Sequence, residues 1–161
     1  MAQGLWLKEL AQNTNQQTRA DIASTANKYK DSTDWAYDKK KGTFACNTWK
    51  CNEFVGDVTK EAGAPAEIKG RYPLAGEWAD TKTKIDNWRV LGADEKPQPG
   101  DVAAYKIPGC HGCTGHSGIV VGVDSQGVHA MAAHADVVGP DNKFQPTNPG
   151  VVYRRYTGDQ Q

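Results

Sequence analysis

The sequence of 161 residues predicts an α+β fold, with N-terminal helices packed on a mainly antiparallel sheet. Apolar residues recur at helical spacing before residue 65 and in strand-like runs after residue 97. The 17 glycines and 8 prolines indicate many turns and loops. A turn signal at residues 124–127 separates two apolar runs, as in an antiparallel hairpin.

The first forty residues are predicted to form two helices and a connection. Residues 4–12 form a short helix, residues 13–18 a polar linker, and Asp21 opens a second helix. A charged, turn-rich connection follows at residues 31–42.

A third helix is predicted next, capped by Asn47 and Thr48 and ended by a left-handed Gly63. Cys51 then falls in its first turn, where unpaired backbone N–H groups and the helix dipole favour the thiolate. Lys50 adds a positive charge beside the sulfur. The alternative is that Cys51 is a small buried apolar residue.

Residues 69–94 are rich in glycine, proline and tryptophan, and are predicted to form loops with one short helix within residues 71–80. Arg71, Tyr72 and Trp78 are candidates for substrate contact in this region. The alternative is that the tryptophans fill a second small core.

The second half predicts strands, of which residues 117–123 form a central one because their apolar run is continuous. The other expected strands cover residues 102–107, 128–133, 137–138 and 151–156.

Length and composition limit the function. We expect one domain over residues 1–161. Zero net charge argues against nucleic acid as a partner, and the lack of a long apolar run argues against membrane insertion. The N-terminus lacks the apolar core of a signal peptide, so we expect a cytoplasmic protein or one exported without a cleaved signal.

A thiol nucleophile needs a base, which is usually a histidine. His116 is the strongest candidate, since it stands where the predicted central strand begins. For the residue that orients this base, His129 shares the face of His116 by strand parity but lies far along the hairpin. His134 and Asp136 lie closer along the strand, on the wrong face unless a β-bulge intervenes. The residue pattern leaves these alternatives open.

The stretch Cys110–Cys113, together with His116, could form a zinc site. No second cysteine pair completes four ligands, so a disulfide or two free thiols are favoured, and we expect no metal or cofactor. Cys46 is either a second buried thiol or a disulfide partner.

Three motifs occur in the order found in NlpC-type and CHAP peptidoglycan amidases, which the chain resembles over residues 20–135. They read KCNEFV at 50–55, PGDV at 99–102 and GHSGIV at 115–120. The resemblance implies a papain-like cysteine peptidase core with Cys51 as nucleophile and His116 as base.

The same resemblance implies His129 as the third catalytic residue, because residues 128–130 read VHA, as in the NlpC pattern.

The stretches STDWAYDKKKGTF, NTWKCNEFV, RYPLAGEWAD and VVYRRYTG resemble the second family of type VI secretion amidase effectors and their domesticated animal relatives. This closer resemblance implies an antibacterial effector delivered to the target-cell periplasm. It also implies cleavage of stem peptides, at the bond between D-alanine and meso-diaminopimelate, and a cognate immunity protein.

Three other interpretations compete with a peptidoglycan amidase. Lipid enzymes of the lecithin-retinol acyltransferase type place the histidine before the cysteine, whereas His116 follows Cys51. A non-catalytic wall-binding module needs neither residue. A zinc-stabilised interaction domain would rest on Cys110 and Cys113.

Overall fold

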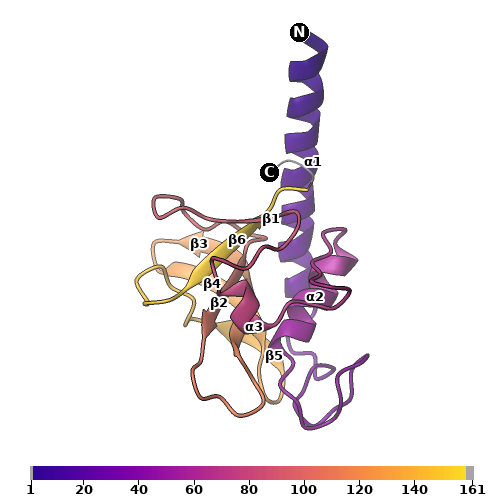
Figure 1. The fold of residues 1–161 in the computed structure, drawn as a ribbon, viewed down its shortest axis with the longest axis vertical. Coiled ribbons are helices and arrows are strands. Elements are labelled where there is room, and N and C mark those ends of the chain that lie inside the picture. The colour runs from indigo at the N-terminus through magenta and orange to yellow at the C-terminus, as the bar shows by residue number, and fades with distance from the viewer. Residues whose placement is uncertain (1, 159–161) are drawn as a thin grey trace.

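The computed structural model describes residues 2–158 and combines helices with a six-stranded sheet in the order β1-β6-β2-β3-β4-β5 (Figure 1). All five strand pairings are antiparallel. The helices are α1 (Ala2–Lys28), α2 (Cys51–Glu61) and α3 (Ala75–Trp78). The strands are β1 (Trp88–Val90), β2 (Val102–Lys106), β3 (Gly115–Asp124), β4 (Gly127–Ala133), β5 (Val138–Asp141) and β6 (Val152–Tyr156).

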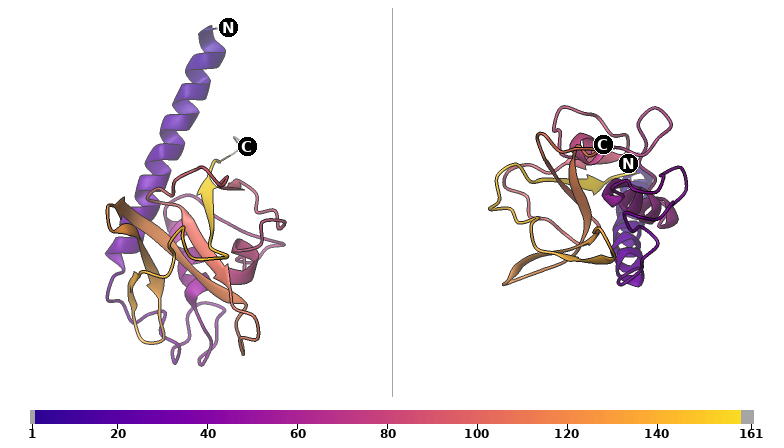
Figure 2. Two further views of the ribbon diagram at one scale, coloured as in Figure 1. Left: turned by 90° about the vertical axis from the view of Figure 1, so that its left-hand side faces the viewer. Right: turned by 90° about the horizontal axis from the view of Figure 1, so that it is seen from below.

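The predicted α+β class with an antiparallel sheet is therefore confirmed. Helices α1 and α2 both contact β3, which lies between β2 and β4 as expected for a central strand. Figure 2 shows these two helices on one side of the curved sheet.

Helix α1 corrects the prediction of two helices joined by a linker, because it runs unbroken through residues 13–18. This segment contains no proline or glycine to stop the helix. The Thr14 and Thr18 hydroxyls donate to the carbonyls of Leu10 and Thr14, one turn earlier. The N-terminal part of α1 projects beyond the rest of the molecule (Figure 1).

Helix α2 begins later than its predicted caps, since Cys51 is its first residue and Lys50 its N-cap. Gly63 adopts the expected left-handed conformation, with φ of 84°. The Lys50 ammonium does not lie beside the sulfur as a free charge. It donates to the carbonyls of Ala36, Tyr37 and Thr48 at 2.9–3.2 Å, which fixes the segment leading into the helix.

A β-bulge between Val120 and Gly122 shifts the register of the β3–β4 hairpin. Gly122 pairs with His129 as predicted, but Ile119 pairs with Met131. Because the bulge adds one residue to β3, the side chains beyond it change their partners on β4.

Apolar residues fill both faces of the sheet. The face under the helices packs Val102, Ile119 and Met131 against α1 and α2, and the other packs Val120, Ala130 and Phe144. Within residues 2–158, no helix combines the length and the apolar character needed to cross a membrane.

Candidate active site

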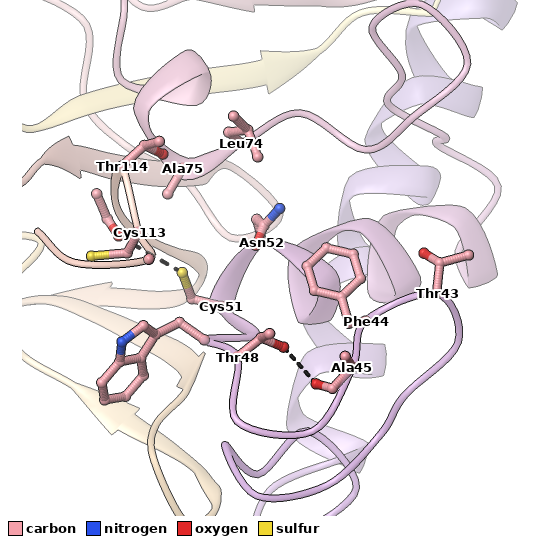
Figure 3. Close-up of a pocket in the computed structure, with 13 residues that line it drawn as sticks. Thr43, Phe44, Ala45, Thr48, Cys51, Asn52, Leu74, Ala75, Cys113 and Thr114 are labelled. Atoms are coloured by element: carbon pink, nitrogen blue, oxygen red, sulfur yellow. Dashed lines mark hydrogen bonds between the residues drawn. The ribbon is translucent and has the colours of Figure 1, made fainter.

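Cys51 opens α2 at the bottom of a cleft, with 6% of its surface exposed. Its thiol lies 3.9 Å from the carbonyl oxygen of Gly115, the first residue of β3 (Figure 3). The first-turn N–H groups of α2 have no partner within the helix, so they are available to a ligand at the sulfur.

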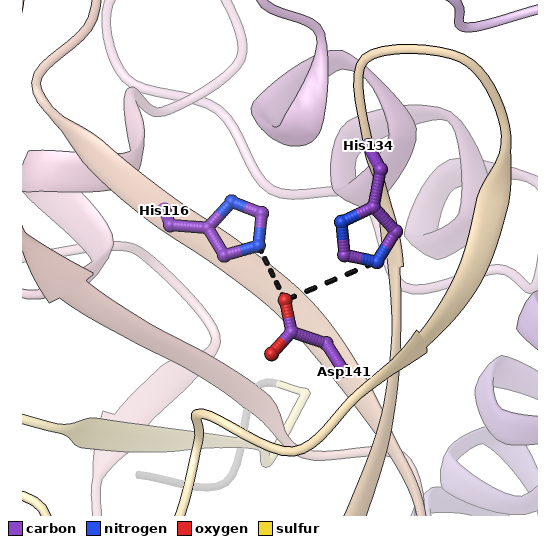
Figure 4. A group of neighbouring side chains, drawn as sticks. All are labelled: His116, His134 and Asp141. Carbon is purple, nitrogen blue, oxygen red and sulfur yellow. Dashed lines mark hydrogen bonds and ion pairs between the residues drawn. The ribbon is translucent and has the colours of Figure 1, made fainter.

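His116, the next residue of β3, is held from several sides (Figure 4). Its Nε2 lies 2.8 Å from Oδ2 of Asp141, the last residue of β5. Its ring stacks on Phe144 with centroids 5.2 Å apart, and Tyr105 packs edge-on at 5.8 Å. Since Asp141 occupies Nε2, Nδ1 is the nitrogen left to face Cys51.

Cys51 and His116 form a coupled pair. Burial raises the pKa of the Cys51 thiol, but hydrogen bonding and charge from His116, aided by Ser117, bring that pKa below its ordinary value. Burial lowers the pKa of His116, while Asp141 and Cys51 outweigh it and raise that pKa to about 9. Both effects favour a thiolate–imidazolium pair at neutral pH.

Asp141 is the residue of this site that the sequence did not reveal. Its side chain is 4% exposed, and Oδ1 accepts the backbone N–H of Lys143. Burial raises the pKa of the carboxyl, but the bonds from His116 and Lys143 lower it overall. The sequence shows only an acidic residue three positions after the predicted strand at 137–138. Its position next to His116 depends on the register of β5, which the sequence does not give.

The prediction that His129 orients His116 is wrong. His129 lies opposite Gly122, six residues or roughly 20 Å along β3 from His116. Its Nε2 pairs with Asp124 at 2.9 Å, and half of the side chain is exposed. The bulge instead brings His134 beside His116, with ring centroids 5.9 Å apart.

A cleft of about 650 Å³, which we call the main cleft, opens above Cys51. Figure 3 shows Cys113 on one side of it and Phe44 on the other. A smaller pocket of about 370 Å³ shares Cys51 with the main cleft and contains His116 and Asp141. Substrate can therefore reach the sulfur from the main cleft, while the imidazole lines the smaller pocket.

Cys110 and Cys113 form a disulfide in the loop between β2 and β3, with Cα atoms 5.3 Å apart. A zinc site built on these two sulfurs is therefore wrong. Both cysteines line the small pocket, so the disulfide braces part of its wall. Cys46 is free and exposed, which makes neither of its predicted roles correct.

The three predicted substrate contacts take different positions. Arg71 and Tyr72 line a further pocket beyond the main cleft. Arg71 is engaged in a bidentate ion pair with Glu77, at 2.7 and 3.0 Å. Trp78 is wrong as a substrate contact, since it is 1% exposed and packs edge-on against Trp88 in the core.

Among the described residues, His116, His134 and Asp141 form the group whose donor atoms could hold a metal ion, all within 4.8 Å of one another. Figure 4 shows both rings turned toward the carboxylate. The Nε2 of His116 is already bonded to Asp141, so a metal there would compete with the orientation of the imidazole.

A protein-family model described as "CHAP domain" matches residues 42–135, more than half of the chain. The match includes Cys51 and His116 and stops before Asp141. A search of curated proteins and a search of solved structures each find no match.

Proposed function

The chain belongs to the CHAP domain family, and from this we propose that it cleaves amide bonds in peptidoglycan by thiol acyl transfer. CHAP domains are peptidoglycan hydrolases of the amidase or peptidase kind. The observation that carries the mechanism is the buried Cys51 beside an imidazole that Asp141 holds at 2.8 Å.

In the proposed reaction, the Cys51 thiolate attacks the carbonyl carbon of a peptide bond in the main cleft. The oxygen takes up negative charge and is stabilised by N–H groups of the first turn of α2, including those of Cys51 and Asn52. The His116 imidazolium gives its proton to the leaving amine as the C–N bond breaks, which leaves a thioester on Cys51.

Water completes the cycle. Neutral His116 removes a proton from a water molecule that attacks the thioester, and the C–S bond breaks to regenerate the thiolate–imidazolium pair. The other product is a carboxylic acid, which loses its proton to solvent. Asp141 keeps Nδ1 of His116 directed at the sulfur throughout, as the acidic member of a catalytic triad does. The helix-borne thiol facing a strand-borne imidazole supports a papain-like arrangement.

The narrower parts of the proposal rest on the sequence resemblance. The scissile bond is a stem-peptide or cross-link amide, between D-alanine and meso-diaminopimelate. Residues 1–161 act as one domain of an antibacterial effector delivered to the target-cell periplasm, where a cognate immunity protein would counter it.

Digestion of isolated Gram-negative peptidoglycan tests the function, with mass spectrometry to identify the bond cut. We expect Cys51→Ala to abolish release of muropeptides while its circular dichroism spectrum stays unchanged. Cys46→Ala is the matched control, since this exposed cysteine lies outside the pair and should leave the rate unchanged. Undiminished digestion by Cys51→Ala would end the thiol mechanism, and wall binding without digestion by the wild type would indicate a non-catalytic module.

A further inference from the structure

The main cleft continues past Phe44 into a further pocket of about 560 Å³, which we call the acidic pocket. The two share Thr43, Phe44 and Leu74, and Figure 3 shows these three on the side of the main cleft away from Cys113. A substrate that presents its carbonyl to Cys51 can therefore place a neighbouring side chain in the acidic pocket.

Glu53 lines this pocket, and one of its carboxylate oxygens has no hydrogen-bond partner among the described residues. The residue is 3% exposed, and its buried Oε2 accepts no hydrogen bond from the described residues. None of the ion pairs within residues 2–158 includes it. A buried carboxylate without a partner is costly, so such a group calls for an explanation.

The nearest cations are engaged elsewhere. Lys41 places its ammonium over the ring of Trp35, 4.7 Å from the centroid. Lys50 directs its ammonium to backbone carbonyls. Both act on Glu53 through charge only.

Asp57, one helical turn further along α2, adds negative charge without supplying a donor. Its two carboxylate oxygens already accept the Tyr72 hydroxyl at 2.8 Å and the Trp35 indole N–H at 2.9 Å. Burial, followed by the charge of Asp57, raises the pKa of Glu53 to about 7. A cation reaching this site would meet two carboxylates, one of them with a free oxygen.

Other charged groups border the acidic pocket. Lys60 and Glu67 are both exposed, and their opposite charges offset each other. Arg71 is bound to Glu77. The carboxylates of the buried Glu53 and the half-buried Asp57 therefore set the charge that a substrate group would meet inside.

We propose that Glu53 is a specificity residue that binds the free side-chain ammonium of the diamino acid in a peptidoglycan stem peptide. This rests on the proposed function, since it assumes that the stem peptide occupies the main cleft. An ammonium carries three donors and a compact charge, so it can satisfy the unpartnered Oε2. The peptide backbone itself offers no positive group for this site.

The test compares two stem-peptide substrates that share the bond identified in the digest. In one, the diamino acid on the carbonyl side of that bond, whose side-chain amine is not part of the bond, keeps this amine free, and in the other the same amine is acetylated. We expect wild-type kcat/KM to be about tenfold higher for the free amine, the value of one charge-assisted hydrogen bond. Glu53→Gln should lower kcat/KM for the free amine to the acetylated level and leave the acetylated substrate unaffected.

Glu67→Gln is the matched control, because it removes the same charge from the exposed part of the same pocket and should keep the preference. Equal rates of the wild type on both substrates would overturn the proposal without any variant. So would a Glu53→Gln protein that keeps the tenfold preference.

A separate measurement distinguishes failure of the subsite from failure of the enzyme. Wild-type protein that cuts neither substrate refutes the proposed function. Calorimetric titration of Cys51→Ala protein with the two peptides then still tests the subsite. Binding about tenfold tighter for the free amine supports it, and equal affinity or no binding refutes it.

Discussion

Replacing Asp141 by asparagine tests how the site works. The substitution keeps the size of the side chain but removes the negative charge that lies 2.8 Å from His116 Nε2. A hydrogen bond to a charged group contributes about 1.5–3 kcal/mol, and each 1.4 kcal/mol corresponds to tenfold in rate. We therefore expect kcat/KM at pH 7 to fall about 10–100-fold.

The pH profile gives a second readout. Asp141 helps to raise the pKa of His116 to about 9 from its ordinary 6.5, so the wild-type imidazolium persists to about pH 9. In Asp141→Asn the contribution of Asp141 to the raised pKa of His116 is lost. The alkaline limb of kcat/KM should therefore shift down from about pH 9 to a value between pH 6.5 and 9. The assay follows new amino groups released from purified peptidoglycan between pH 5 and 10.

The control is Asp124→Asn, which removes the carboxylate from the exposed pair with His129. It should leave both the rate and the profile unchanged. An Asp141→Asn enzyme with wild-type kcat/KM and an unmoved alkaline limb would refute the role of Asp141.

Three further predictions concern the surroundings of the site. Because the folded-state pKa of Glu53, about 7, lies above its ordinary 4.5, protonation stabilises the fold below pH 4.5 and this contribution is lost as pH rises through 7. Glu53→Gln should thus be more stable than wild type by about 1–3 kcal/mol at pH 8 and equal at pH 4 in urea unfolding, and equal stability at both would contradict the buried charge. Lys50→Met leaves three backbone carbonyls without their donor, so it should lose about 2–4 kcal/mol of unfolding free energy, whereas the exposed Lys60→Met should lose almost none. Replacing Cys110 and Cys113 by serine removes the disulfide from a pocket wall that does not bond to the reacting atoms. Steady-state kinetics should therefore show a higher KM with kcat near that of the wild type. A fall in kcat with KM unchanged would give the disulfide a role in the chemistry.

Local pattern was enough to predict α2, its cysteine and the main strands. The helical spacing, Gly63 and the apolar run after Ser117 are sequence features that reflect interactions between residues close in the chain. The structure contains the elements that these features indicate. The linker predicted between residues 13 and 18 failed because polar residues without proline or glycine permit a helix as readily as a loop.

The identity of the third residue of the site, the partner of His116, depended on the register of the strand pairings. Ideal pairing gave His129 the same face as His116, but one extra residue in β3 realigned everything beyond Val120. The sequence allowed for such a bulge without locating it. Asp141 then arrives on β5, from a strand whose alignment no local pattern fixes.

The chain alone determined the chemical types present: a thiol at a helix start, an imidazole at a strand start, and the motifs that match the CHAP family. Tertiary structure decided which groups meet, because Asp141 reaches His116 only through two strand pairings and a bulge. It also decided that Trp78 is core and that Oε2 of Glu53 has no hydrogen-bond partner within residues 2–158. Burial and pairing are properties of the whole packed chain, so spacing along it does not determine them.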